Sequence, residues 1–178
     1  MEKKALAVTM TTGVLATVFA VTLFSQVLPL QVENIVNMGA SINTPFDDFA
    51  PSFTADGKIM VFNSKRSGEA YQNIYLCRNE DGKWSEPRGI NEINSPYNDE
   101  TPFITPDGAF IFFASDRDGS LEMPADAAGK IRVSYDLYVS QNIGGRWQRP
   151  IRLPGTVNTV HHERSPSLSR DLSTLYYT

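Results

Sequence analysis

"TPFITPDGAFIFFASDRDGS", residues 101–120, places a Pro-Asp-Gly turn directly before a run that is almost entirely apolar. Pro106 suits an early position of a β-turn, and Gly108 supplies a positive φ at no steric cost. A run that is apolar on both faces indicates a strand lying between two neighbouring strands. The stretch therefore predicts a tight hairpin within a larger buried sheet.

The same pattern occurs three times along the chain, in segments that begin at Ile42, Ile93 and Val157. They read "INTPFDDFAPSFTADGKIMVFNSKR", "INSPYNDETPFITPDGAFIFFASDR" and "VNTVHHERSPSLSRDLSTLYYT". Without a gap, each keeps an Asn, an acid, a Pro, a turn Asp and an aromatic residue at fixed spacing. In chain order these are Asn43, Asn94 and Asn158; Asp48, Asp99 and Glu163; Pro51, Pro102 and Pro166; Asp56, Asp107 and Asp171; and Phe62, Phe113 and Tyr177. Such spacing indicates a structural repeat, in which the turn Asp residues cap the chain reversal and the recurring aromatic residues belong to the core.

The second half of the unit also recurs, because "NIYLCRNEDGKWSEPRGI" aligns with "DLYVSQNIGGRWQRPIRL". Trp84 then matches Trp147, and Pro87 matches Pro150. Each unit reads as four short antiparallel strands, with the last at an edge because Pro cannot donate to a β-ladder. The predicted units are residues 42–92, 93–156 and 157–178, and the extra length of the second falls in an interstrand loop at residues 121–133.

The motif P-x-x-[ST]-x-D-G, an apolar strand ending in Phe-x-Ser, and a closing W-x-x-P resemble the WD-like propeller repeats that carry Pro-Asp. Such repeats occur in TolB-like periplasmic proteins and in envelope proteins whose propeller precedes a peptidoglycan-binding domain. The resemblance covers residues 42–178 and implies an all-β fold, a partial β-propeller of about two and a half blades. A closed ring needs about four to eight blades, so we expect further blades downstream. Leu172 stands where the turn Gly is expected, at a cost of roughly 1 kcal/mol.

The N-terminus predicts export. Lys3 and Lys4 are followed by no charged residue until Glu33, and residues 5–30 are apolar or small. We expect a hydrophobic helix, with residues 1–31 forming either a signal peptide cleaved after small residues near Ala20 or an uncleaved membrane anchor. In both cases the remainder is periplasmic or otherwise extracytoplasmic. Residues 32–41 are expected to be a linker or a strand that closes the last blade.

The acids Asp48, Asp99 and Glu163 are the candidate channel or interface residues. An acid at the same place in every unit indicates an architectural hydrogen bond, to the backbone or to the adjacent blade, more than a catalytic pair. Channel-facing contacts with a ligand are the alternative. The sequence names no catalytic residue.

The sequence gives little support for a metal site or for a catalytic triad. "SDRDGSLE" lacks the spacing of a calcium loop, and His161 and His162 lack partners for zinc binding or for a catalytic triad. Both histidines are therefore predicted to be loop residues. We therefore predict no metal and no cofactor. The net charge is −4 and the Lys and Arg residues are scattered, which argues against nucleic-acid binding. Cys77 is the only cysteine, so no internal disulfide can form.

The resemblance favours a non-enzymatic scaffold of the bacterial cell envelope. Its partner would be an envelope protein or a peptidoglycan-associated protein, with the insertion at residues 121–133 as the first expected contact. The alternative is the propeller portion of a peptidase, or of a carbohydrate-binding or carbohydrate-hydrolysing enzyme, whose catalytic part lies downstream.

Overall fold

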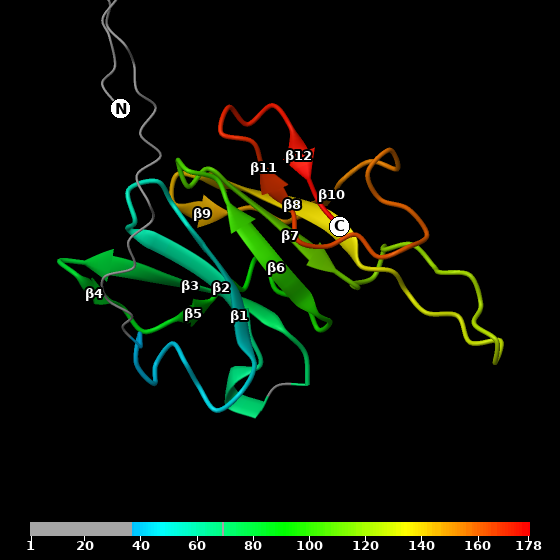
Figure 1. Ribbon diagram of the computed structural model, residues 1–178, viewed down its shortest axis with the longest axis horizontal. Coiled ribbons are helices and arrows are strands. Elements are labelled where there is room, and N and C mark those ends of the chain that lie inside the picture. The colour runs from blue at the N-terminus through cyan, green and yellow to red at the C-terminus, as the bar shows by residue number, and fades with distance from the viewer. Residues whose placement is uncertain (1–36, 69) are drawn as a thin grey trace, which may run out of the picture. The chain divides into compact units, whose positions relative to one another are not determined.

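The computed structural model describes residues 37–68 and 70–178 (Figure 1). The predicted signal peptide or anchor, with its hydrophobic helix, lies outside the described residues. Within them the structure is all-β, with one 3-10 turn, η1 (Arg66–Gly68), and no α-helix. Residues 37–41, the described part of the predicted linker or closing strand, contain no strand.

The first predicted unit, which we call module 1 (residues 42–92), is an antiparallel meander. Its strands are β1 (Asp48–Phe53), β2 (Ile59–Ser64), β3 (Asn73–Glu80), β4 (Lys83–Trp84) and β5 (Arg88–Gly89). The last two both pair with β3, so they are the two halves of one edge strand interrupted near Pro87. The expected four-stranded unit is confirmed, and Pro87 lies at the edge of the sheet, as predicted.

Module 2 (residues 93–156) repeats this sheet with the same order and register. Its strands are β6 (Asp99–Ile104), β7 (Phe110–Ser115), β8 (Asp136–Ile143), β9 (Arg146–Trp147) and β10 (Ile151–Arg152). Asp48 lies opposite Ser64 in module 1, and Asp99 lies opposite Ser115 in module 2. The insertion falls between β7 and β8, as the alignment predicts.

Module 3 (residues 157–178) is described as one hairpin, β11 (Ser167–Leu168) paired with β12 (Leu175–Tyr176). Its turn confirms the predicted departure, because Leu172 has a φ of 60° where Gly57 and Gly108 have 66° and 71°. The prediction that Tyr177 is a core aromatic is wrong, since its side chain is 42% exposed. Among the described residues, no third strand lies beside this hairpin to cover it.

The turn acids close the hairpins. Thr54 Oγ1 donates to Asp56 Oδ1 at 2.7 Å, and the Lys58 N–H donates to the same oxygen at 3.0 Å. Asp107 and Asp171 repeat this arrangement with their own neighbours. These bonds lower the pKa of Asp56, with the Thr54 hydroxyl as the main cause. The predicted structural role of the turn acids is confirmed.

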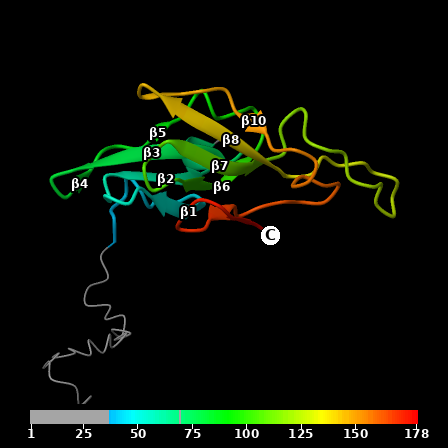
Figure 2. The ribbon, with the colours of Figure 1, turned by 90° about the horizontal axis from the view of Figure 1, so that it is seen from above.

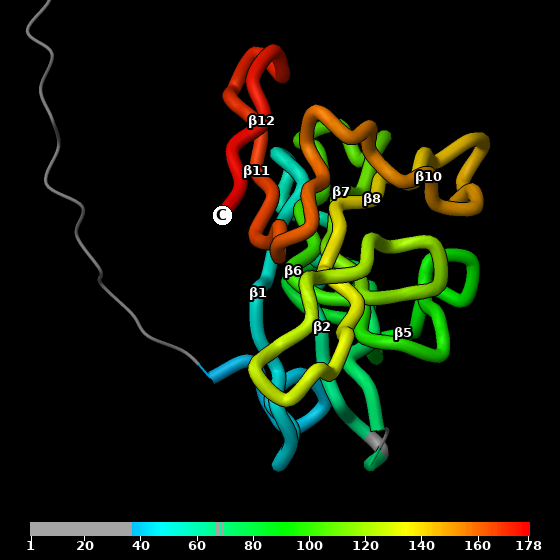
Figure 3. Tube along the Cα trace, turned by 90° about the vertical axis from the view of Figure 1, so that its right-hand side faces the viewer, coloured from blue at the N-terminus to red at the C-terminus, as the bar shows by residue number. Residues whose placement is uncertain are grey.

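The modules stack side by side, and Figure 2 shows the second sheet lying over the first. β6 packs against β1, β2 and β3. The buried cluster between them joins side chains of both modules: Val61, Ile74, Ile90, Ile93, Ile104, Ile111, Phe113, Tyr138 and Trp147. The first strands of the modules, β1, β6 and β11, lie along one side of the described unit (Figure 3).

Candidate functional site

The three recurring acids fasten the loop before each first strand. Asp48 Oδ2 accepts hydrogen bonds from the Thr44 N–H and Thr44 Oγ1, both at 2.6 Å. Asp99 accepts the same pair of bonds from Ser95, and Glu163 accepts them from Thr159. The side chains of Asp99 and Glu163 are buried. The acids therefore make the architectural hydrogen bonds that their recurrence indicates, while a contact with a channel ligand stays a prediction.

An arginine completes each of the first two acid sites. Arg66 bonds Asp48 at 3.1 Å and lies over the rings of Phe62 and Tyr75, each within 4.9 Å of the ring centre. Arg117 makes the matching ion pair with Asp99 in module 2. Burial alone would raise the pKa of Asp48, but hydrogen bonds from Ser64, Thr44 and Arg66 outweigh it and hold that pKa below its usual value. The carboxylate is therefore ionised, and its hydrogen bonds are made to groups of its own module.

The recurring Asn joins each module to the one before it. Asn94 Oδ1 accepts from the Ile74 N–H at 2.8 Å, and Asn94 Nδ2 donates to the Ile74 carbonyl at 2.9 Å. Asn158 makes the same two bonds with Leu137, at 2.7 and 3.0 Å. One side-chain amide thus satisfies both main-chain groups of a strand residue, as a neighbouring strand would.

A second junction contact uses residues that sequence reasoning missed. The Asp99 N–H donates to the Gln72 carbonyl at 2.9 Å, and the Gln72 N–H donates to Asn98 Oδ1 at 3.2 Å. At the next junction the Glu163 N–H donates to the Tyr135 carbonyl at 2.7 Å. There the N–H of Tyr135 donates to Nδ1 of His162 at 3.0 Å. His162 is thus a junction residue in the role of Asn98, beyond the loop position predicted for it.

The residue before each recurring Pro adopts a left-handed conformation. The φ angles of Ala50, Thr101 and Ser165 are 54°, 49° and 52°. Such a conformation costs roughly 1–3 kcal/mol at a residue other than Gly and persists only where the surroundings impose it. Here it turns the amide of Thr101 onto Asn63 Oδ1 at 3.0 Å, and that of Ser165 onto Thr101 Oγ1 at 3.1 Å.

These three bends meet in a cavity of about 210 Å³ that all three modules line. Its walls are Ala50, Pro51, Ser52, Thr101, Pro102, Phe103, Ser165 and Pro166. The hydroxyls of Ser52 and Thr101 already accept main-chain N–H groups of the next module. The cavity is therefore a product of module packing, and it contains none of the three acids.

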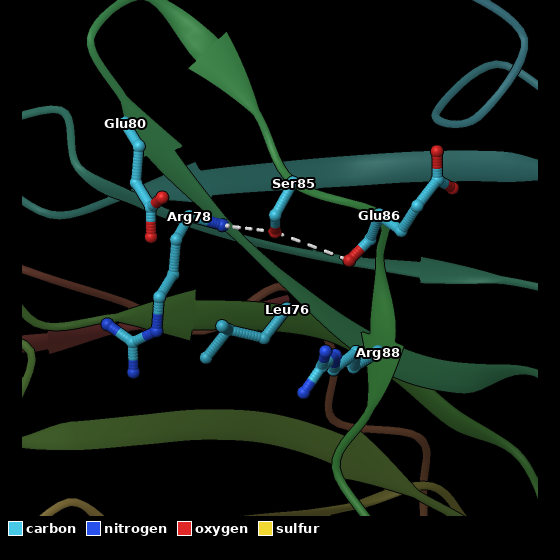
Figure 4. Close-up of a pocket in the computed structure, with 6 residues that line it drawn as sticks. All are labelled: Leu76, Arg78, Glu80, Ser85, Glu86 and Arg88. Atoms are coloured by element: carbon cyan, nitrogen blue, oxygen red, sulfur yellow. Dashed lines mark hydrogen bonds between the residues drawn. The ribbon is translucent and has the colours of Figure 1, made fainter.

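A larger cavity, of about 390 Å³, lies on β3 beside its edge strand (Figure 4). It is lined by Leu76, Arg78, Glu80, Ser85, Glu86 and Arg88. Arg78 and Arg88 point to the same side and flank Leu76. Module 2 has Gln141 and Ile151 at the two arginine positions, so this surface is particular to module 1. The two guanidinium groups give it the chemistry to contact carboxylates.

The insertion folds into a braced arm that extends beyond the sheets (Figure 1). Glu122 and Val133 form an antiparallel bridge, and the Met123 N–H donates to the Arg132 carbonyl at 2.8 Å. Its base is held by the buried Asp136, which accepts hydrogen bonds from Ser134 Oγ and the Leu121 N–H. Near the tip of the arm, Ile131 is 57% exposed.

Two further findings concern the described residues. They contain no group of three His, Cys, Asp or Glu side chains placed to hold a metal ion. In that part of the chain, no helix is long and apolar enough to cross a membrane.

Comparisons with known proteins give a partial likeness. No family model matches the chain, and no curated protein matches it. The solved structure of TolB from Acinetobacter baumannii is 24% identical over 72% of this chain and 25% of that one, with a TM-score of 0.46. The solved structure of the putative TolB from Agrobacterium tumefaciens is 22% identical over 73% of this chain and 42% of that one, with a TM-score of 0.41. The chain thus spans less than half the length of either protein.

Proposed function

We propose that the chain is part of an extracytoplasmic β-propeller that serves as a scaffold for protein–protein interaction in the bacterial cell envelope. Support for the propeller comes from the sideways stacking of two matching four-stranded sheets, with a third matching hairpin beside them. Radial repetition of such sheets is the architecture of a propeller. Support for export comes from the charge pattern of residues 1–33.

The observation that carries the scaffold role is the arm at residues 121–133. Its internal bonds brace it, and Ile131 and Val133 are 57% and 41% exposed. Apolar side chains held out on a rigid loop lose little entropy when a partner covers them. Asp126, Lys130 and Arg132 flank them and supply the polar rim that is typical of a protein interface.

Site-specific photocrosslinking in cells of the source organism tests this role. A photoreactive phenylalanine at Ile131 should give a discrete crosslinked band containing an envelope protein. The same group at Tyr176, which is 58% exposed on module 3, is the matched control and should give none. An Ile131→Asp, Val133→Asp double variant should lose the interaction without losing stability, because both side chains are exposed. Crosslinking that is absent, or equal at both positions, contradicts the scaffold role.

The candidate acids have a supporting role in this proposal. Asp48, Asp99 and Glu163 hold the loop before the first strand of each module, and a direct contact between these acids and a partner stays a prediction. The enzyme alternative, with a catalytic part downstream, stays a prediction.

A further inference from the structure

The cavity of about 390 Å³ on β3, which we call the arginine groove, holds two exposed arginines. Its floor is Leu76, a half-buried side chain that packs against the apolar cluster shared by modules 1 and 2. Arg78 and Arg88 flank Leu76 (Figure 4). Within residues 37–68 and 70–178 neither guanidinium group forms an ion pair, and the hydrogen bond between Arg78 and Ser85 Oγ uses the main-chain N–H. The groove therefore offers two guanidinium groups beside an apolar floor.

The acids of the groove do not pair with these arginines. Glu80 and Glu86 line the same cavity, but no ion pair joins either of them to an arginine of the described chain. Figure 4 shows the Glu86 side chain directed away from Arg78 and Arg88. The two guanidinium groups therefore keep their donors for an acceptor from outside the module.

The fold does not require this pair of arginines. Arg88 lies opposite Leu76 in the register of β3 and β5, and Arg78 is two residues further along β3. The arginines are therefore diagonal neighbours on one face of the sheet, where like charges repel each other. Module 2 forms the same sheet with Gln141 and Ile151 at these positions. The pair therefore suits a contact made outside the sheet.

The groove stays open in the proposed propeller. Residues of the first strands, or beside them, meet at one cavity that all three modules line, and β5 lies on the opposite side of its sheet from β1 (Figure 3). In a ring of such sheets the first strands surround the axis, and the edge strand made of β4 and β5 lies on the outer rim. Both modules beside the groove are described, so its walls stay the same when further modules join the ring.

We propose that the arginine groove is a docking site for an extended acidic segment of a partner protein, with carboxylates two residues apart. Alternate residues of an extended segment lie on one face, roughly 6.6 Å apart. Diagonal neighbours in a sheet are about 7–8 Å apart, so each carboxylate can face one arginine. A guanidinium group binds a carboxylate through two parallel hydrogen bonds. The methylene groups of the acidic side chains then cover Leu76. The inference rests on the proposed scaffold role and adds the chemistry of a second contact surface.

A capped peptide of sequence Gly-Ser-Glu-Val-Glu-Gly-Ser is the probe. Its matched control is Gly-Ser-Glu-Glu-Val-Gly-Ser, which has the same composition and charge. Binding to the full chain is followed by NMR at the side-chain Nε–H groups of Arg78 and Arg88 and at the amide of Leu76. The probe should give saturable shifts with a dissociation constant on the order of 1 mM. The control should bind at least about threefold more weakly, because its adjacent acids point to opposite faces.

Two double variants test which arginines bind the probe. Arg78→Gln with Arg88→Ile copies module 2 and should abolish the shift at Leu76. Arg146→Gln with Arg149→Ile removes two exposed arginines at the edge of module 2, with the same change in charge, and should leave binding intact. The amide spectra of both variants should match that of the wild-type chain, because all four side chains are exposed.

The docking site is overturned if the probe gives no saturable shift, if the control peptide binds equally well, or if the first double variant still binds. Inorganic phosphate that shifts the same signals as strongly at the same concentration would also overturn it, because the groove would then hold any small anion. Crosslinking at Ile131 is read separately, so a failed groove with intact crosslinking leaves the scaffold role standing.

Discussion

Replacing the recurring asparagines tests the junction account quantitatively, with Asn158→Ala as the main variant. Asn158 is 1% exposed and makes three bonds to main-chain groups, with the Leu137 N–H, the Leu137 carbonyl and the Leu153 carbonyl, at 2.7, 3.0 and 2.8 Å. A net loss of about 0.5–1.5 kcal/mol for each bond gives a total of about 1.5–4.5 kcal/mol.

The equivalent asparagines are the controls. Asn94 is half-buried and makes two such bonds, so Asn94→Ala should cost about 1–3 kcal/mol. Asn43 is exposed, and its side chain bonds Asn37, so Asn43→Ala should cost less than about 0.5 kcal/mol. The same substitution in the same repeat position therefore predicts a graded series.

Urea unfolding followed by tryptophan fluorescence measures the series, because Trp84 reports on module 1 and Trp147 on module 2. The free energy of unfolding should fall in the order Asn43→Ala, Asn94→Ala, Asn158→Ala, with Asn158→Ala the least stable. Equal losses at the three positions, or a loss at Asn158 below about 0.5 kcal/mol, would refute the reasoning that these amides join the modules.

Four further outcomes follow from single sites. Leu172→Gly should stabilise the chain by about 1 kcal/mol in the same assay, because it relieves a left-handed residue; an unchanged midpoint would contradict this. Burial raises the pKa of Cys77 to about 11, so this thiol should resist alkylation until urea unfolds the chain. The lowered pKa of Asp48 stabilises the fold above the unfolded value of 3.8, and this contribution is lost as the pH falls through the lower folded value. Stability measured from pH 7 to pH 3 should therefore fall less steeply in Asp48→Asn. His162→Ala should cost about 1 kcal/mol, whereas His162→Asn should cost less because Asn retains an acceptor for the Tyr135 N–H.

The repeat and its strands could be predicted from the sequence because their signals are local. The Pro-Asp-Gly turn fixes where β6 ends and β7 begins, and the apolar run of β7 follows from its burial on both faces. The recurrence of the acids predicts an architectural role, and their bonds to Thr44, Ser95 and Thr159 fit that role.

The junction contacts could not be predicted in the same way. Asn98 and His162 both accept a main-chain N–H, Asn98 through its amide oxygen and His162 through a ring nitrogen, so no single residue type marks the position. Their partners, Gln72 and Tyr135, are about half a module away in sequence. The groups that they contribute belong to the main chain, so their side chains give no signal of the contact. The bends at Ala50, Thr101 and Ser165 run against the local rule, since a residue before Pro ordinarily prefers an extended conformation.

The central claim is that a recurring Asn binds the third strand of the preceding module, β3 or β8. Amide hydrogen exchange at Ile74 and Leu137, followed residue by residue by NMR, tests it most directly. The account predicts that both amides are protected in the wild-type chain, and that Asn158→Ala removes protection at Leu137 while Ile74 keeps it. Rapid exchange at Leu137 in the wild-type chain, or unchanged protection there in Asn158→Ala, would contradict it.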